Sequence, residues 1–155
     1  NALLSRKDLP KDALTKLTAA EEVKFVLATR AQTDAQVLNS LAADSDTSLR
    51  TQVAVHPATT AATLDKLSKD KSQYVRAACA SNPAASFALL KDLAADSEPL
   101  VRSRVAANPH SNADVLKLLT QDKSPEVRRA LASNPNTPQE VLTVLANDDT
   151  IWLTR

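Results

Sequence analysis

The chain has 155 residues, of which 43% are hydrophobic, 24% charged and 3% aromatic, and its net charge is +1. The balanced charge gives no electrostatic argument for nucleic acid or a membrane surface as a partner. Glycine is absent, which excludes phosphate-binding glycine loops, the dinucleotide fingerprint and the GxSxG nucleophile elbow. The single cysteine, Cys79, excludes an internal disulfide and a multi-cysteine metal site. No apolar run reaches the roughly 20 residues of a membrane span.

Several columns of identical residues recur with a 26-residue step. They include Pro57, Pro83, Pro109 and Pro135; Leu38, Leu64, Leu90, Leu116 and Leu142; and Ala28, Ala54, Ala80, Ala106 and Ala132. Several independent columns with one period indicate a repeat architecture. We expect one solenoid domain over residues 1–155, with full units 18–43, 44–69, 70–95, 96–121 and 122–147 between the partial units 1–17 and 148–155.

In chain order, residues 2–5 of the partial unit 1–17 match the end of a first helix and residues 10–17 match a second helix, and the turn that follows is two residues shorter than in the other units. Thr18 and Glu21 then have the spacing of a capping box, which predicts a helix start. Each full unit is predicted to hold a short first helix and a second helix. The partial unit 148–155 begins another first helix. Because both chain ends fall inside a short helix, we expect a piece of a longer array.

Unit 122–147 shows the two helices most clearly. Val127 and Leu131 lie on one face of a first helix of about 8 residues. Asn134 ends this helix, because a residue before proline is pushed out of the α region. Thr137 is then predicted to cap the second helix, with Glu140 completing a capping box. Ser111 with Asp114, and Thr33 with Gln36, are related pairs.

The segment from Asp122 to Arg128 has the spacing of the Asp…Val-Arg signature of HEAT repeats. The run from Val127 to Pro138, followed by leucines at 142 and 145, more closely resembles the leucine-rich-repeat variant family, a bacterial offshoot of the HEAT-like solenoids. The resemblance covers nearly the whole chain. It implies an all-α fold, a right-handed superhelix in which short, often 3₁₀-like helices alternate with α-helices. By analogy with HEAT repeats, the helix that carries Val127 and Arg128 would line the concave side.

One member of that family carries an iron–sulfur module, which needs clustered cysteines. Because this chain has only Cys79, we expect no cofactor and no metal, and we interpret Cys79 as a buried apolar residue. His56 and His110 lie in different columns and are interpreted as loop or capping residues. An unpaired cysteine also fits a reducing compartment, so we expect a cytoplasmic location.

An aspartate column precedes a basic column by six residues. Its members are Asp44, Asp70, Asp96 and Asp122, followed by Arg50, Arg76, Arg102 and Arg128. We expect a structural ladder in which each carboxylate caps a first helix and meets an arginine of its own or the adjacent unit. The alternative is a row of charges that faces a ligand.

The first helices are also predicted to expose a strip of small, mildly basic residues. Its members are Thr51, Val55, Ala77, Ser81, Ser103, Arg104, Ala107, Arg129 and Ser133, with Tyr74 and Leu100 at the entry to the helix. Tyr74 belongs to a 26-residue column that also contains Glu22, Ser48, Glu126 and Trp152. The two aromatic residues of this column, Tyr74 and Trp152, either anchor an interface or pack within the array.

A solenoid offers long continuous surfaces without a catalytic pocket, so we expect a non-catalytic scaffold that binds a protein or peptide. The alternatives are a HEAT-like array that binds nucleic acid and a structural or regulatory arm of a larger enzyme. Nucleic acid needs a basic stripe. The five full units carry formal charges of −1, 0, +1, 0 and 0, which argues against that partner.

Overall fold

The computed structural model describes residue 16 and residues 18–152, with side chains up to Thr150. The rest of the partial unit 1–17, the Trp152 side chain and residues 153–155 lie outside the described residues. The first helices are α2 (Glu21–Thr29), α4 (Thr47–Val55), α6 (Gln73–Ser81), α8 (Pro99–Ala107) and α10 (Pro125–Ser133). The second helices are α3 (Ala35–Leu41), α5 (Ala61–Leu67), α7 (Phe87–Leu93), α9 (Ala113–Leu118) and α11 (Gln139–Ala146), and α12 (Asp149–Trp152) follows.

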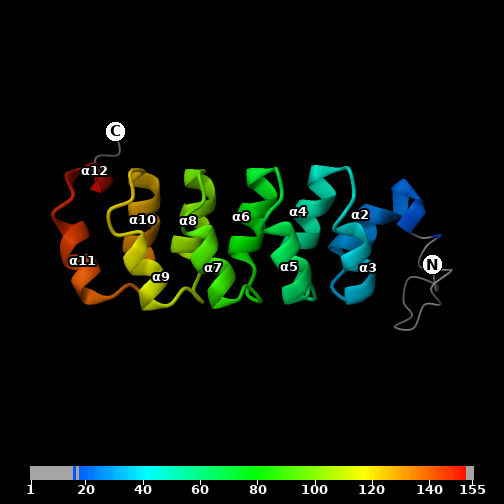
Figure 1. Cartoon of the computed structure of the whole chain (residues 1–155), viewed down its shortest axis with the longest axis horizontal. Helices are drawn as coiled ribbons and strands as arrows, with labels where there is room; N and C mark the ends of the chain where they lie inside the picture. The colour runs from blue at the N-terminus through cyan, green and yellow to red at the C-terminus, as the bar shows by residue number, and fades with distance from the viewer. Residues whose placement is uncertain (1–15, 17, 153–155) are drawn as a thin grey trace.

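These helices stack into an elongated all-α solenoid with two rows (Figure 1). Each first helix from α4 to α10 begins 26 residues after the one before it. First helices contact the first helices on either side far more extensively than second helices contact one another. The expected fold class is therefore confirmed, and no strand occurs among residues 18–152.

The expectation of 3₁₀-like first helices is wrong, because every helix within residues 18–152 is an α-helix. The first helices have nine residues, and residues four apart such as Leu49 and Val53 are buried together. Burying such pairs against two neighbouring helices requires the 3.6-residue period of the α-helix.

The first helices α4, α6, α8 and α10 end where the sequence predicts, at the residue before proline, whereas the C-cap of α2 is Arg30, which precedes Ala31. His56, Asn82, Asn108 and Asn134 are the C-caps, with ψ between 122° and 131°. This extended conformation is the one that a following proline imposes.

The predicted caps of the second helices are wrong by one residue. Asp34 and Asn112 cap α3 and α9 with their side chains, and Pro138 is the N-cap of α11. Thr137 instead donates to the carbonyl of Leu131 (2.6 Å). The end of a first helix leaves carbonyls without helical partners, and the buried hydroxyl satisfies one of them. Thr33 and Ser111 do the same at the ends of α2 and α8.

The predicted start of α2 is also wrong. Thr18 was expected to cap this helix in a capping box with Glu21, but the N-cap is Ala20, without a side-chain hydrogen bond, and Glu21 is the first helical residue.

The core is one continuous layer between the two rows of helices. Leu38, Leu64, Leu90 and Leu116 are at most 1% exposed, and so are Ala54, Ala80 and Ala106 of the first helices. Alanine at the contact between first helices allows them to pack closely. A single first helix buries little area by itself, so each depends on its neighbours for stability.

Candidate functional site

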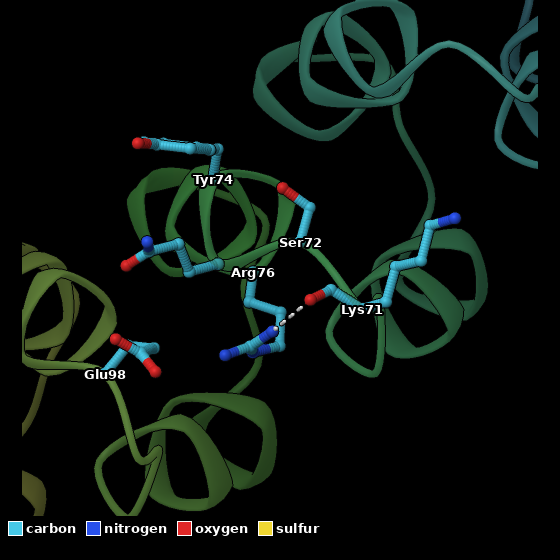
Figure 2. Close-up of a pocket in the computed structure, with 6 residues that line it drawn as sticks. Lys71, Ser72, Tyr74, Arg76 and Glu98 are labelled. Carbon is cyan, nitrogen blue, oxygen red and sulfur yellow. Dashed lines mark hydrogen bonds between the residues drawn. The ribbon is translucent and has the colours of Figure 1, made fainter.

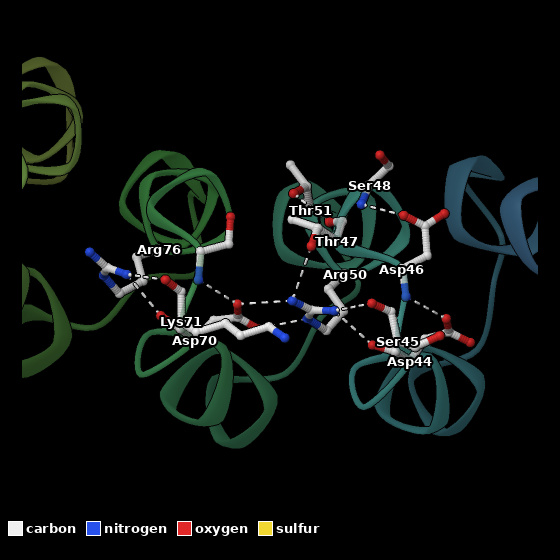
Figure 3. A network of polar contacts seen from close by, with 11 residues as sticks. Asp44, Ser45, Asp46, Thr47, Ser48, Arg50, Thr51, Asp70, Lys71 and Arg76 are labelled. Carbon is white, nitrogen blue, oxygen red and sulfur yellow. Dashed lines mark hydrogen bonds and ion pairs between the residues drawn. The ribbon is translucent and has the colours of Figure 1, made fainter.

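An ionic ladder runs along the solenoid where one unit meets the next. Nε of Arg50 donates to Oδ2 of Asp70 (2.7 Å) and Nη2 donates to Oδ1 (3.0 Å). Nη1 of Arg50 donates to the carbonyls of Asp44 (2.8 Å) and Ser45 (2.9 Å). The guanidinium therefore joins the loop before its own helix to the carboxylate of the following unit (Figure 3).

The same geometry recurs in the next units. Arg76 pairs with Asp96 (2.7 Å) and Arg102 pairs with Asp122 (2.6 Å), in each case through two parallel hydrogen bonds. The side chains of these four residues are between 7% and 15% exposed. Such buried, bidentate pairs differ from surface ion pairs, whose contribution is small.

Each carboxylate also accepts a backbone N–H. Oδ1 of Asp70 accepts from the amide of Ser72 (2.8 Å), and Asp122 accepts from Ser124 (2.9 Å). Ser72 and Ser124 are the residues just before α6 and α10. The aspartate therefore orders the turn that leads into the helix and does not bond the first helical amides.

These contacts lower the pKa of the aspartates. The Arg50 hydrogen bond is the main cause of the lowered pKa of Asp70. For Asp96, burial acts in the opposite direction. The Arg76 hydrogen bond, the Glu98 amide and the nearby guanidinium charges together outweigh it, so the pKa is lowered. The ladder carboxylates are therefore held in the charged form.

The ladder extends further than the arginine column. Lys24 takes the arginine position of the first full unit and its Nζ bonds Asp44 (2.7 Å). At the other end, Arg128 bonds Asp148. The 26-residue step from Lys24 to Arg50 is the sequence signal that identifies this further member.

A second ladder, which the sequence analysis missed, lies at the opposite end of the first helices. Nδ2 of Asn82 donates to the carbonyl of Ala54 (2.7 Å), and Oδ1 accepts from the amide of Ala84 (2.8 Å). Asn108 bonds Ala80 (2.6 Å) in the same way. These asparagines are 1–3% exposed, so they hold neighbouring units together inside the protein. The recurrence of asparagine before proline at 82, 108 and 134 is the sequence signal for this ladder.

The predicted partner-binding residues lie on one face of the first helices, at i, i+3 and i+4 spacing. We call this set, from Thr51 to Ser133, the first-helix face. The exposed members are Val55, Tyr74, Ser81, Arg104, Ala107, Arg129 and Ser133; Thr51 and Leu100 are half-buried; Ala77 and Ser103 are buried.

The hydroxyl groups of this face are directed back to the helices that carry them. Thr51 donates to the carbonyl of Thr47 (2.8 Å), Ser81 to that of Ala77 (3.1 Å) and Ser103 to that of Leu100 (2.9 Å). The face is consequently less polar than its composition suggests. Tyr74 and Val55 contribute its large exposed apolar surfaces, at 61% and 44% exposure.

An open pocket of about 270 Å³ adjoins this face at the start of α6. Figure 2 shows Tyr74 and Ser72 on one side of the pocket, with Glu98 across from Lys71. Arg76 lines the pocket but is bound to Asp96 and to the carbonyl of Asp70 (2.8 Å). The pocket is therefore a recess beside the exposed tyrosine and contains no free guanidinium.

The remaining candidate groups are engaged in the fold. Cys79 is buried, and burial raises the pKa of its thiol to about 12. His56 is buried between two loops, while His110 is exposed. Within residues 18–152, no group of three metal-ligating side chains comes together. No helix in this part of the chain is both long enough and apolar enough for a membrane crossing.

Fold and ladders together define the class of protein, an α-solenoid repeat scaffold. The family follows from comparison: residues 76–134 match the model described as the Leucine Rich Repeat Variant domain, and residues 125–149 match the Leucine rich repeat variant model. Residues 76–149 thus match leucine-rich-repeat variant models, which confirms the resemblance for this part of the chain, and the HEAT-like description is compatible with it. Comparisons with curated proteins and with solved structures gave no match.

Proposed function

We propose that this chain is a non-catalytic scaffold that binds a protein segment along the first-helix face. The observation that carries the proposal is the exposure of Tyr74 and Val55 on a row of helices fixed to one another at both ends. A preorganised surface loses little conformational entropy on binding, which favours affinity. Exposed aromatic residues are the usual anchors of protein interfaces.

The packing of the rows supports the choice of this face. First helices contact one another more closely than second helices do. In a curved stack the more closely spaced row lies on the inside, so the first-helix face would be the concave one. A concave face wraps around a helix or an extended segment and increases the contact area.

The chemistry of the face favours a partner with apolar side chains. Tyr74 of α6 and Arg104 of α8 are the exposed large side chains of this face on the two helices, while Ala77 and Ser103 are buried. The tyrosine ring and the adjoining pocket would take an apolar or aromatic side chain. A cytoplasmic location belongs to the same proposal, because Cys79 forms no disulfide.

Site-specific photocrosslinking in the source cells tests this proposal. A photoreactive amino acid replaces Ser81 on the first-helix face, and in a control Asp92, which is exposed on α7. We expect one discrete protein adduct from position 81 that is lost when Tyr74→Ala is added, and no such adduct from position 92. Equal labelling from both positions, or an adduct insensitive to Tyr74→Ala, would contradict the proposal.

A further inference from the structure

One member of the asparagine ladder is a histidine. His56 occupies the column of Asn82, Asn108 and Asn134 and is 4% exposed. Its Nε2 lies 2.8 Å from the carbonyl oxygen of Arg30, and its Nδ1 lies 3.1 Å from the amide nitrogen of Ala58. Asparagine makes the equivalent pair of contacts with its amide group, as Asn134 does with the carbonyl of Asn108 (2.9 Å) and the amide of Asn136 (2.9 Å).

These two partners fix the protonation state of the ring. A carbonyl oxygen can only accept, so Nε2 of His56 carries the proton that is donated to Arg30. A backbone amide can only donate, so Nδ1 is unprotonated and accepts from Ala58. The neutral Nε2–H imidazole therefore reproduces two contacts of the asparagine amide, but it has no second N–H for a bond such as the one that Asn134 also makes to the carbonyl of Ala106.

Protonation would remove this match. The imidazolium ion has two N–H donors and no acceptor, so Nδ1–H would face the N–H of Ala58 in a buried position. An asparagine has no such second state. From this geometry we propose that His56 makes the joint between α2 and α4 pH-sensitive: protonation loosens this joint, while joints closed by asparagine do not respond.

The two partners of the His56 ring are backbone groups, the carbonyl oxygen of Arg30 at Nε2 and the amide of Ala58 at Nδ1, so neither of these contacts would balance the charge of an imidazolium ion. The loops that its contacts bring together are 29–33, 57–60 and 81–84, and their one ionisable side chain is that of Arg30. On the neighbouring helices the ionisable residues are Glu21, Glu22 and Lys24 of α2, Arg50 of α4, Asp65 and Lys66 of α5 and Tyr74, Arg76 and Cys79 of α6, while α3 has none. Lys24, Arg50 and Arg76 belong to the ionic ladder at the other end of the first helices.

The ionic rung at the same joint has a single hydrogen bond to its carboxylate. Lys24 makes one bond to the Asp44 carboxylate, where Arg50 makes two to Asp70. The ionic rung between α2 and α4 therefore has one hydrogen bond to its carboxylate fewer than the rung between α6 and α8. Val55, next to His56, lies on the first-helix face, so movement at this joint would change the spacing of that face.

The test compares backbone amide exchange in the wild-type chain and in His56→Asn, measured by NMR at pH 7.5 and pH 5.5. Comparing two variants at one pH cancels the pH dependence of the chemistry of exchange. We expect the amides of 53–59 to exchange at similar rates at pH 7.5. At pH 5.5 these amides should exchange at least about three-fold faster in the wild type than in His56→Asn. One linked proton can change the opening equilibrium by at most about ten-fold per pH unit, and the expected effect lies within this limit. The NMR signals of the His56 ring nitrogens at pH 7.5 should be those of a neutral imidazole protonated on Nε2.

A second variant keeps the test decisive. His56→Asn combined with Asn108→His moves the histidine to the joint between α6 and α8, and amides 105–111 should then acquire the pH response. His110 is present in all three proteins, so any effect of its protonation on amide exchange is common to them and does not alter the comparison. A wild-type to His56→Asn ratio that is the same at both pH values would overturn the proposal, as would a neutral ring protonated on Nδ1.

Discussion

Removal of the Asp122 carboxylate would measure what the ionic ladder contributes to stability. Asp122→Ala deletes two hydrogen bonds from Arg102 (2.6 and 2.9 Å) and one from the amide of Ser124 (2.9 Å). It leaves a guanidinium that is 14% exposed without its counter-charge. Breaking a fully buried pair from one side costs about 3–5 kcal/mol.

Here the loss should be smaller, because Arg102 keeps its bonds to the carbonyls of Asp96 (2.7 Å) and Ser97 (3.0 Å) and retains some contact with water. We therefore expect Asp122→Ala to lower the free energy of unfolding by about 2–3 kcal/mol. Asp92→Ala removes an exposed carboxylate and should change it by less than about 0.5 kcal/mol. Urea unfolding at pH 7, followed by circular dichroism, measures both.

A double-mutant cycle with Arg102→Gln isolates the pair. The coupling energy between Asp122 and Arg102 should reach about 1–2 kcal/mol, within the range for residues in one network. Amide exchange should quicken first in α8 and α10, because repeat proteins are stabilised through the interfaces between neighbouring units. A urea curve of Asp122→Ala that overlays the wild type would refute the structural role and would favour a charge row that faces a ligand.

Three further outcomes follow from the same contacts. Asn108→Ala should cost about 1–3 kcal/mol in urea unfolding, because the buried carbonyl of Ala80 loses its partner. The pKa of Asp70 in the folded protein lies below its ordinary 3.8. The stability that this carboxylate contributes is therefore complete above about pH 5 and is lost as the pH falls through the lowered pKa. Acid unfolding should show this loss, and Asp70→Asn should make the free energy of unfolding depend less steeply on pH. Duplex DNA should bind no more tightly than about 10⁻⁴–10⁻⁶ M at physiological salt, as fluorescence anisotropy would measure, since Arg50 and Arg76 are engaged with aspartates.

Local sequence determined the order of the helices and the residue at which each of α4, α6, α8 and α10 ends. Asn134 stands before Pro135, and steric exclusion of the α region by that proline ends α10 whatever surrounds it. Leucines that recur every 26 residues, such as Leu64 and Leu90, indicate the repeat and are buried in the second helices. The helix ends depend on adjacent residues and the repeat on recurring residue types, so both can be predicted from the chain alone.

Only the tertiary structure decided which groups meet across units. Asp122 lies six residues before Arg128, yet its carboxylate pairs with Arg102 of the preceding unit. Thr137 lies at the position where the sequence predicts the N-cap of the second helix, yet its hydroxyl donates to the carbonyl of Leu131. The 26-residue repeat predicts that a contact recurs in each unit. Which residue each aspartate contacts depends on the distance between units, and the stacking of adjacent helices sets this distance. The pairing of Asn82 with Ala54 depends on the same stacking, because it joins residues that no local propensity brings together.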